Sequence, residues 1–219
     1  MEFSFYTIRQ YLPLFMEAFF NTLYVATVSL FFALIVGIIG GLCKVSKNKI
    51  IFTFASLYVN LIRSTPLLAQ LYLIFFGLPY LGICFSPFLT GVIALTFNNG
   101  AYVTEIVRAG IQAIPKGQVE ASLSLGMNYF SMMRRIIFPQ AFVIIIPPLT
   151  SQLVRLIKAS SLLSIIAYTE LTRAGDTVAA DSFAPTEGYL TSAFFYLIIT
   201  YSLIKLSKYF EKKLNSHKK

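Results

Sequence analysis

The sequence is poor in the groups from which enzymes build active sites. Its 219 residues include one histidine, two cysteines and nine Asp or Glu residues. The single histidine, His217, lies in a basic tail, which argues against a histidine-based metal site or a catalytic triad. The sequence contains no G-x-x-x-x-G-K-[ST] motif and no pairing of carboxylates, or of a nucleophile with a base, that indicates chemistry. We therefore predict a protein that is not an enzyme and holds no metal or cofactor of its own.

Charged residues are also scarce. Their distribution along the sequence distinguishes a basic membrane protein from a nucleic-acid-binding protein. Only 12% of the residues are charged and 57% are hydrophobic, whereas soluble domains carry about a quarter charged residues. This composition predicts an integral membrane protein. The formal charge of +9 does not indicate nucleic-acid binding, because the basic residues fall between apolar runs, where they act as topology signals. Cys43 and Cys84 lie at opposite ends of the predicted spans, which is too far for a disulfide.

Long apolar runs predict a single all-α transmembrane domain, residues 1–219, with five membrane-spanning helices. The first 18 residues show amphipathic periodicity and predict a separate helix at the membrane interface. The second span exceeds the roughly 20 residues that a bilayer needs, and Pro66 predicts a break within it. An acidic external loop is expected over 168–188. The five predicted spans cover residues 19–43, 51–80, 88–106, 141–167 and 189–206.

Sorting the basic residues by side predicts the orientation. Arg9 and Arg173 are the only basic loop residues on one side of the predicted spans. The N-terminus is therefore expected outside and the C-terminus inside, with a cytoplasmic loop over 112–140 between the third and fourth spans. The other side carries Lys44, Lys47, Lys49, Arg108, Lys116, Arg134, Arg135 and six lysines from Lys205 to Lys219.

Basic residues within the spans indicate a polar passage. Ser151, Arg155 and Lys158 lie at i, i+4 and i+7, which places them on one helix face, and Arg63 lies one turn before the break at Pro66. Such cations are costly in a bilayer unless they snorkel, find a partner or face a wet cavity. We favour the cavity because Glu105 is the only acid near these spans. A cavity with several cations and few acids would attract an anionic group such as a carboxylate.

The loop over 112–140 is too polar to lie within a bilayer, since Pro115, Gly117 and Gly126 interrupt it and four charged residues lie along it. Its pattern predicts two short helices with a bend at Gly126 and one apolar side. Two interpretations remain open at this point. The loop could lie on the membrane surface as an amphipathic element, or it could be the docking site of a soluble partner.

Several ordered motifs resemble a known family. Glu120, Ala121 and Gly126 form E-A-x-x-x-x-G, which is followed by Phe-Pro-Gln over 138–140. This pattern is similar to the EAA loop in permease subunits of bacterial ABC importers. Segments 62–79, 98–111 and 156–173 resemble the polar amino acid uptake branch, which includes histidine, glutamine, arginine and cystine permeases. The resemblance covers residues 15–213.

The resemblance implies two sets of functional residues. Relatives commonly have an acidic or amide residue where this sequence has Ala159, and this difference favours a neutral or acidic amino acid over a cationic one. The residues implied to contact the ATPase are Gly117, Glu120, Ala121, Gly126 and Met127. Those implied to bind substrate are Arg63, Gln70, Asn99, Gln152, Arg155, Lys158 and Ser160.

The resemblance also implies partners and a location. The chain would be a multi-pass protein of the bacterial cell membrane, surrounded by membrane lipid. It would pair with a second permease copy or a paralogue, and two copies of an ABC ATPase subunit would supply ATP and Mg²⁺. An extracytoplasmic amino acid binding protein would deliver the substrate, and ATP-driven rocking of the spans would give alternating access.

Two other classes of function are weighed against this importer subunit. A secondary transporter or channel subunit working without an ATPase would predict an inverted repeat and intramembrane acids, and the sequence shows neither. A membrane anchor or scaffold without a passage would leave the basic residues of the spans without a purpose.

Overall fold

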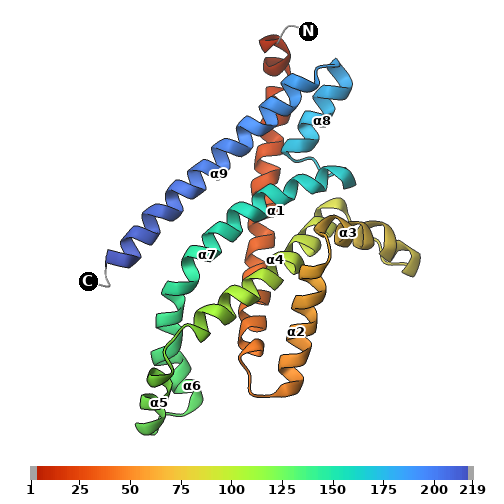
Figure 1. The fold of residues 1–219 in the computed structure, drawn as a ribbon. Helices are drawn as coiled ribbons and strands as arrows, with labels where there is room; N and C mark the ends of the chain where they lie inside the picture. Colours follow the sequence, from red (N-terminus) through yellow and green to blue (C-terminus); the bar gives the residue numbers. More distant parts are fainter. Residues whose placement is uncertain (1–3, 217–219) are drawn as a thin grey trace.

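The computed structural model describes residues 4–216, and the regular elements within this range are all helices. His217, Lys218 and Lys219, which enter the charge argument, lie outside the described residues. Short π-helical or 3₁₀ segments lie at Leu73–Gly77, Leu78–Leu81, Met133–Ile137 and Ser160–Ile166. The α-helices, labelled in Figure 1, are α1 (Phe5–Lys44), α2 (Lys49–Ser64), α3 (Leu67–Tyr72), α4 (Pro87–Gln112), α5 (Lys116–Ser124), α6 (Tyr129–Met132), α7 (Phe138–Ala159), α8 (Leu171–Ser182) and α9 (Pro185–Ser216).

The described residues confirm an all-helical membrane fold but give fewer clear spans than expected. Three helical stretches in this range are long and apolar enough to cross a membrane, namely Phe5–Lys44, Tyr129–Ile166 and Pro185–Tyr209. A fourth span results if Lys49–Ser64 and Leu67–Leu81 are counted as one, although they are bent by 103°. The bend lies at Pro66, so the predicted break is confirmed.

Helix α1 differs from the expectation at its N-terminal end. The predicted separate interfacial helix over residues 1–18 is wrong, because α1 runs without interruption for 40 residues and includes Pro13. Phe15 and Ala18 are buried in a cluster with residues of α7, α8 and α9. Only the C-terminal part of this segment therefore packs against protein, whereas Phe5 and Leu12 remain exposed.

Two further boundaries differ from the predictions. The expected loop over 168–188 contains helix α8, whose buried Ala174 and Val178 pack in the same cluster as α1. Gly175 and Gly188 permit α8 and α9 to approach closely, since a methyl group at Gly188 would lie 2.6 Å from the Gly175 carbonyl oxygen. The fourth span, expected from residue 141, belongs to a helical stretch that begins at Tyr129.

Helix α4 is the central element of the fold. It contains buried polar residues such as Asn98, Asn99 and Thr104 as well as apolar ones. Its most extensive contacts are with α1, where Gly37 and Gly41 face Val103 and Val107. Small residues at this spacing let two helices pack at short distance, and polar groups of a membrane helix are tolerated when protein covers them.

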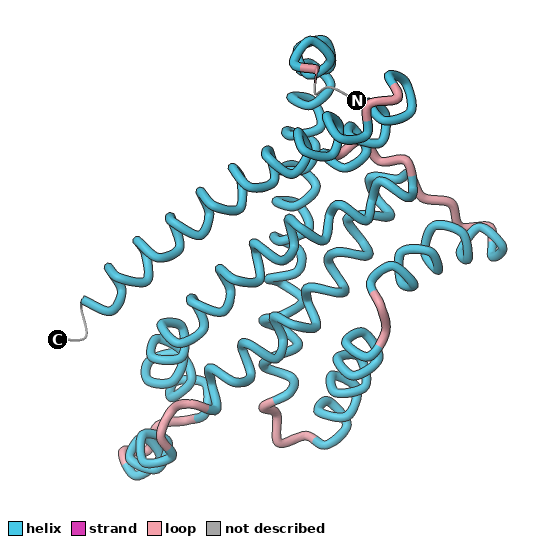
Figure 2. The backbone as a smooth tube through the Cα atoms, turned by 45° about the horizontal axis from the view of Figure 1, so that its top comes forward, coloured by secondary structure: helices cyan, strands magenta, loops and turns pink. Residues whose placement is uncertain are grey.

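The two ends of the molecule carry different segments. Figure 1 shows α5 and α6 at one end, on the same side as the link between α1 and α2, whereas the N-terminus and α8 lie at the opposite end. Figure 2, viewed after a rotation, shows the same separation, and it shows a further loop at the break between α2 and α3, away from both ends. The hydrophilic segment over 112–128 is therefore remote from the acidic segment around α8.

The glycines of α1 predict a stability defect. We expect Gly37→Ala to lower the free energy of unfolding by about 1–3 kcal/mol, because the new methyl group would lie 2.2 Å from Val103 Cγ1 and 2.4 Å from Val103 Cβ. Thermal unfolding of the detergent-solubilised chain measures this loss. The control is Gly117→Ala, where no atom lies within 4 Å. Equal melting temperatures for the two variants would contradict the proposed close packing.

Glu170 caps helix α8 from a fully buried position. Its side-chain oxygens accept hydrogen bonds from the backbone amides of Thr172, at 2.9 Å, and Arg173, at 2.8 Å, and Tyr196 Oη donates a third at 2.6 Å. Burial raises the pKa of the Glu170 carboxyl from 4.5 to about 7, and these hydrogen bonds only partly oppose the shift.

This raised pKa predicts a pH-dependent stability. Between pH 4.5 and about 7 the folded chain holds a proton that the unfolded chain releases. The contribution of Glu170 to stability is therefore fully present below pH 4.5 and is lost as the pH rises through about 7. We expect Glu170→Gln to flatten the pH dependence of the melting temperature over this window, relative to wild type. Parallel pH profiles for the two proteins would show that Glu170 does not titrate there.

Candidate functional site

The break at Pro66 opens a cavity of about 400 Å³ among three parts of the fold. Pro66 has no N–H and forces Thr65 into an extended conformation, so α2 ends and α3 leaves in a new direction. The gap is closed by the polar part of α4 and by α7. The residues that line it are Arg63, Ser64, Thr65, Pro66, Leu67, Asn98, Asn99, Tyr102, Arg155 and Ala159.

Two guanidinium groups lie against one aromatic ring in this cavity. The Cζ atom of Arg155 lies 3.4 Å from the centroid of the Tyr102 ring, and that of Arg63 lies 5.1 Å away. A tyrosine ring attracts cations through its electron-rich face but does not neutralise them. Within the described part of the chain, the ion pairs involve neither arginine, so the cavity keeps a net positive charge.

The acid nearest to these spans in the sequence is engaged elsewhere. Glu105 forms ion pairs with Lys44 of α1 and with Arg108, whose Nη2 lies 2.7 Å from Glu105 Oε2. The pair with Lys44 joins the end of α1 to the part of α4 that precedes α5, and the pair with Arg108 lies within α4. Glu105 is therefore not a partner of the cations in the cavity, as the cavity interpretation requires.

A side-chain amide holds the broken helix together. The Nε2 atom of Gln70 donates to the carbonyl oxygen of Ile62, at 2.8 Å, and to Thr65 Oγ1, also at 2.8 Å. Its Oε1 accepts from Asn98 Nδ2 at 3.1 Å, which ties the break to α4. Gln70 thus satisfies a backbone carbonyl that the break at Pro66 leaves without a helical partner.

A second amide, that of Gln152, lies between Asn99 and Arg155. Asn99 donates from Nδ2 to the carbonyl of Leu95, at 2.9 Å, and its Oδ1 accepts from Gln152 Nε2 at 2.7 Å. With the Gln152 carboxamide turned the other way, this hydrogen bond to Asn99 Oδ1 is lost, and the Gln152 oxygen accepts from Arg155 Nε at 3.1 Å and from Nη2 at 2.6 Å. In that second orientation an amide oxygen holds the guanidinium on one side and the tyrosine ring covers another.

The structure distributes the seven predicted binding residues over four places. Arg63, Asn99 and Arg155 line the cavity, whereas Gln70 and Gln152 lie behind it and hold its walls. Ser160 is buried and donates to the carbonyl of Ile157 at 2.7 Å. Lys158 is exposed on α7 and does not line the cavity.

Tyr102 and Asn98 were not singled out as binding residues. The sequence contains a signal for these residues. Asn98 and Tyr102 are four residues apart and Asn99 lies beside them, so all three lie toward the same side of a helix. Aromatic residues in apolar chains are common, so this signal is weak without the cations opposite.

The segment around Glu120 forms the helix and bend that its sequence predicts. Helix α5 follows Pro115 and exposes Gly117, Glu120 and Ala121. It ends at Ser124, and the turn that follows contains Gly126, whose φ of +73° favours glycine; the Met127 amide donates to the carbonyl of Ser122 at 3.1 Å. Met127 is partly buried against the cluster that contains α4 and α7 residues. The exposed side of α5 therefore belongs to a helix whose C-terminal end is fixed by the turn at Gly126.

The cavity suits binding rather than catalysis. In the described range, no three side chains of the His, Cys, Asp and Glu types come together to form a metal site. The cavity offers two cations, two amides and one aromatic ring, which can hold an anionic group and exclude a cationic one.

Comparisons with known proteins decide the family. A family model described as the binding-protein-dependent transport system inner membrane component matches residues 33–216. The chain belongs to this family. It is therefore an inner-membrane component of a transport system, and the multi-pass helical fold agrees with that location.

Individual members of the family cover almost the whole chain. A putative glutamine transport system permease protein of Rickettsia conorii is 38% identical over 95% of this chain and 97% of its own length. The arginine transport system permease protein ArtQ of Bacillus subtilis is 37% identical and is covered to 96%, as is this chain. A crystal structure described as an amino acid ABC transporter with histidines superposes with a TM-score of 0.92 at 38% identity, over 97% of this chain and all of that one.

Proposed function

We propose that this family member is one of two permease subunits of an ATP-driven amino acid importer, and that the cavity at Pro66 receives the carboxylate of the amino acid. Similar permeases are named for glutamine and arginine transport. The observation that carries the assignment of the site is the pair of guanidinium groups, from Arg63 and Arg155, that share Tyr102 without a carboxylate partner. An arginine can bind a carboxylate through two parallel hydrogen bonds, which gives both affinity and orientation.

The residues that line the cavity also bear on which class of amino acid side chain the substrate has. Ala159 faces the cavity where relatives commonly have an acidic or amide residue. A cationic amino acid would therefore meet two arginines and find no carboxylate at this position. We propose a neutral or acidic amino acid as the substrate.

The open side of α7 supports a second permease copy or paralogue. Ser151 and Lys158 are exposed on the helix face that carries Arg155. An exposed lysine on a membrane helix is costly unless it faces water or protein. A second permease placed against this face would enclose a passage between the two chains, and Lys158 and Ser160 remain substrate-binding candidates there.

The proposed topology keeps five spans, with α4 as the fifth. Helix α4 is long enough to cross a bilayer at 26 residues, and protein covers its polar groups. With the N-terminus outside and the C-terminus inside, α5 and the basic end of α1 face the cytoplasm. A binding protein would then deliver the amino acid at the end where α8 lies.

Energy would come from two copies of a separate ATPase subunit that bind ATP and Mg²⁺. The exposed residues Gly117, Glu120 and Ala121 would contact this subunit, and the turn at Gly126 and Met127 would fix their direction. Movement of α5 would reach α4 through the short connection at Pro115. Closure of the ATPases would thereby rock the spans and alternate the access to the cavity.

The two arginines are tested by transport. We expect Arg155→Ala and Arg63→Ala each to lower uptake of a radiolabelled amino acid about 10- to 100-fold at subsaturating concentration, because each removes a charge-assisted bond to the carboxylate. The matched control is Arg173→Ala, which removes an exposed arginine of α8 outside the cavity. Membrane levels of all three variants must be equal. Normal uptake by both cavity variants would contradict the proposal that this cavity binds the substrate.

The contact with the ATPase is tested by co-purification. We expect a Walker-motif protein to purify with the wild-type chain and to be lost with Glu120→Arg or Gly126→Arg. The first variant reverses an exposed charge, and the second strains the left-handed turn. Asp181→Arg makes the same charge reversal at an exposed acid of α8, at the opposite end of the molecule, and is expected to retain the partner. Retention by all three variants would favour a transporter or channel that works without an ATPase.

A further inference from the structure

A second cavity, of about 600 Å³, lies far from the Pro66 break, at the ends of two candidate spans. One wall is formed by Leu42 near the end of α1 and by Ser46 to Asn48 in the following link. The other wall is formed where the helical stretch beginning at Tyr129 enters its membrane-spanning part. The cavity thus lies at the boundary between the membrane and water, whichever side of the membrane it faces.

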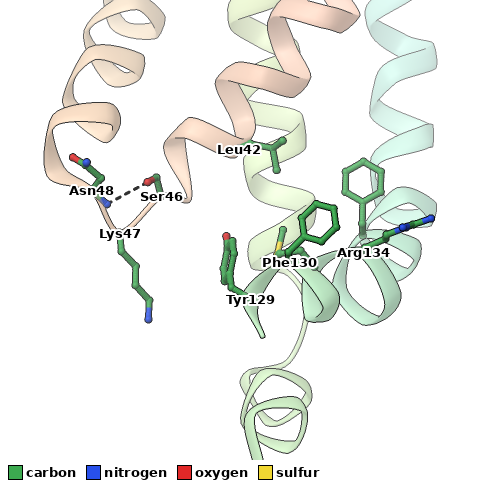
Figure 3. A pocket seen from close by; sticks show the side chains of 9 residues that line it. Leu42, Ser46, Lys47, Asn48, Tyr129, Phe130 and Arg134 are labelled. Atoms are coloured by element: carbon green, nitrogen blue, oxygen red, sulfur yellow. Dashed lines mark hydrogen bonds between the residues drawn. The ribbon is translucent and has the colours of Figure 1, made fainter. Parts of the chain in front are cut away.

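The walls of this cavity combine two kinds of surface. Phe130, Met133 and Phe138 join Leu42 in an apolar surface, and Phe130 is 72% exposed. Figure 3 shows Tyr129 and Phe130 pointing toward the end of α1. Exposed aromatic residues at the end of a membrane helix are typical of the interfacial region of a bilayer.

Two cations flank this apolar surface. Lys47 lies on the link between α1 and α2, and Arg134 lies on the other side of Phe130 (Figure 3). Neither takes part in an ion pair within the described range, where the pairs involve only Glu105 with Lys44 and Arg108. The cavity has no acidic residue in its lining.

We propose that this cavity binds an anionic phospholipid, with the anionic head group held at the rim that carries Lys47 and Arg134 and one acyl chain along Leu42, Phe130 and Phe138. An apolar floor with cations at its rim matches an anionic lipid, whose charge and hydrocarbon lie side by side. Basic pockets between membrane helices bind anionic head groups in the same way. The proposal does not depend on the substrate site or on the proposed transport activity.

The lipid can be detected at the cavity itself, because the chain contains no tryptophan. Phe130→Trp would place a single tryptophan in the wall. The purified full-length variant is reconstituted in vesicles that contain either brominated phosphatidylglycerol or brominated phosphatidylcholine, which quench tryptophan fluorescence on contact. We expect the anionic lipid to give the same quenching at about a tenfold lower mole fraction in the vesicle than the zwitterionic lipid. The reason is that each cation favours an anionic lipid by about 1 kcal/mol, of which salt screens a part.

A matched pair of double variants locates the preference. Lys47→Gln with Arg134→Gln, in the Phe130→Trp background, is expected to give equal quenching by the two lipids. Lys49→Gln with Arg135→Gln removes the same charge from neighbouring residues outside the cavity lining and is expected to keep the preference. If the first double variant does not fold, raising the ionic strength on the unchanged cations must reduce the preference instead.

Three results would overturn the proposal. One is equal quenching of the Phe130→Trp chain by the two lipids at low salt, and another is the same loss in both double variants. The third is quenching that does not distinguish the lipids and is abolished by adding the partner ATPase. This last result would identify a protein contact in place of the lipid.

Discussion

The arrangement of the polar cavity depends on how one broken helix satisfies its backbone. In a membrane, a carbonyl that loses its helical partner must find another donor within the protein. At the Pro66 break Gln70 donates to the carbonyl of Ile62, and its oxygen accepts from Asn98. The same amide therefore stabilises the break and attaches it to the central helix. Together with the hydrogen bond from Tyr58 Oη to the carbonyl of Phe97, this connection fixes the arginine of α2 relative to α4.

Helix α4 combines two environments along its length. Toward the cavity it presents Asn98, Asn99 and Tyr102, and toward its other end it carries Glu105, which pairs with Lys44 and Arg108. Its polar groups are thus distributed between the lining of the cavity, amide pairing and ion pairing. This explains why α4, unlike α1 and α9, does not qualify as a membrane span by composition alone, and why it is covered by its neighbours.

Much of the fold and part of the site followed from the sequence, for identifiable reasons. Apolar length predicted the membrane helices, Pro66 predicted the break, and Gly126 predicted the bend after α5, because each depends on local chemistry. The structure of residues 5–18 and 168–188 was not predictable in the same way. There, amphipathic and acidic patterns indicated surfaces, whereas burial of Phe15 and Glu170 depends on contacts between helices distant in sequence.

Within the site, residue type was informative and side-chain direction was not. Arg63 and Arg155 were predicted as cavity residues because cations within spans need a polar environment. Gln70 and Gln152 were expected to bind substrate, but they use their amides to hold neighbouring residues. Tyr102 becomes important only because two arginines from other helices stack on it, and that convergence is a property of the tertiary structure.

The glycines that bring α1 against α4 have a mechanical consequence. Methyl-sized gaps are absent at Gly37 and Gly41, so neither helix can slide or tilt past the other without a clash against Val103 or Val107. The two helices must therefore move as one rigid strut. Under the proposed function, a displacement delivered by α5 to the adjoining end of α4 would pass along this strut, and the bending would fall at Pro66 between α2 and α3, where the helix is already interrupted.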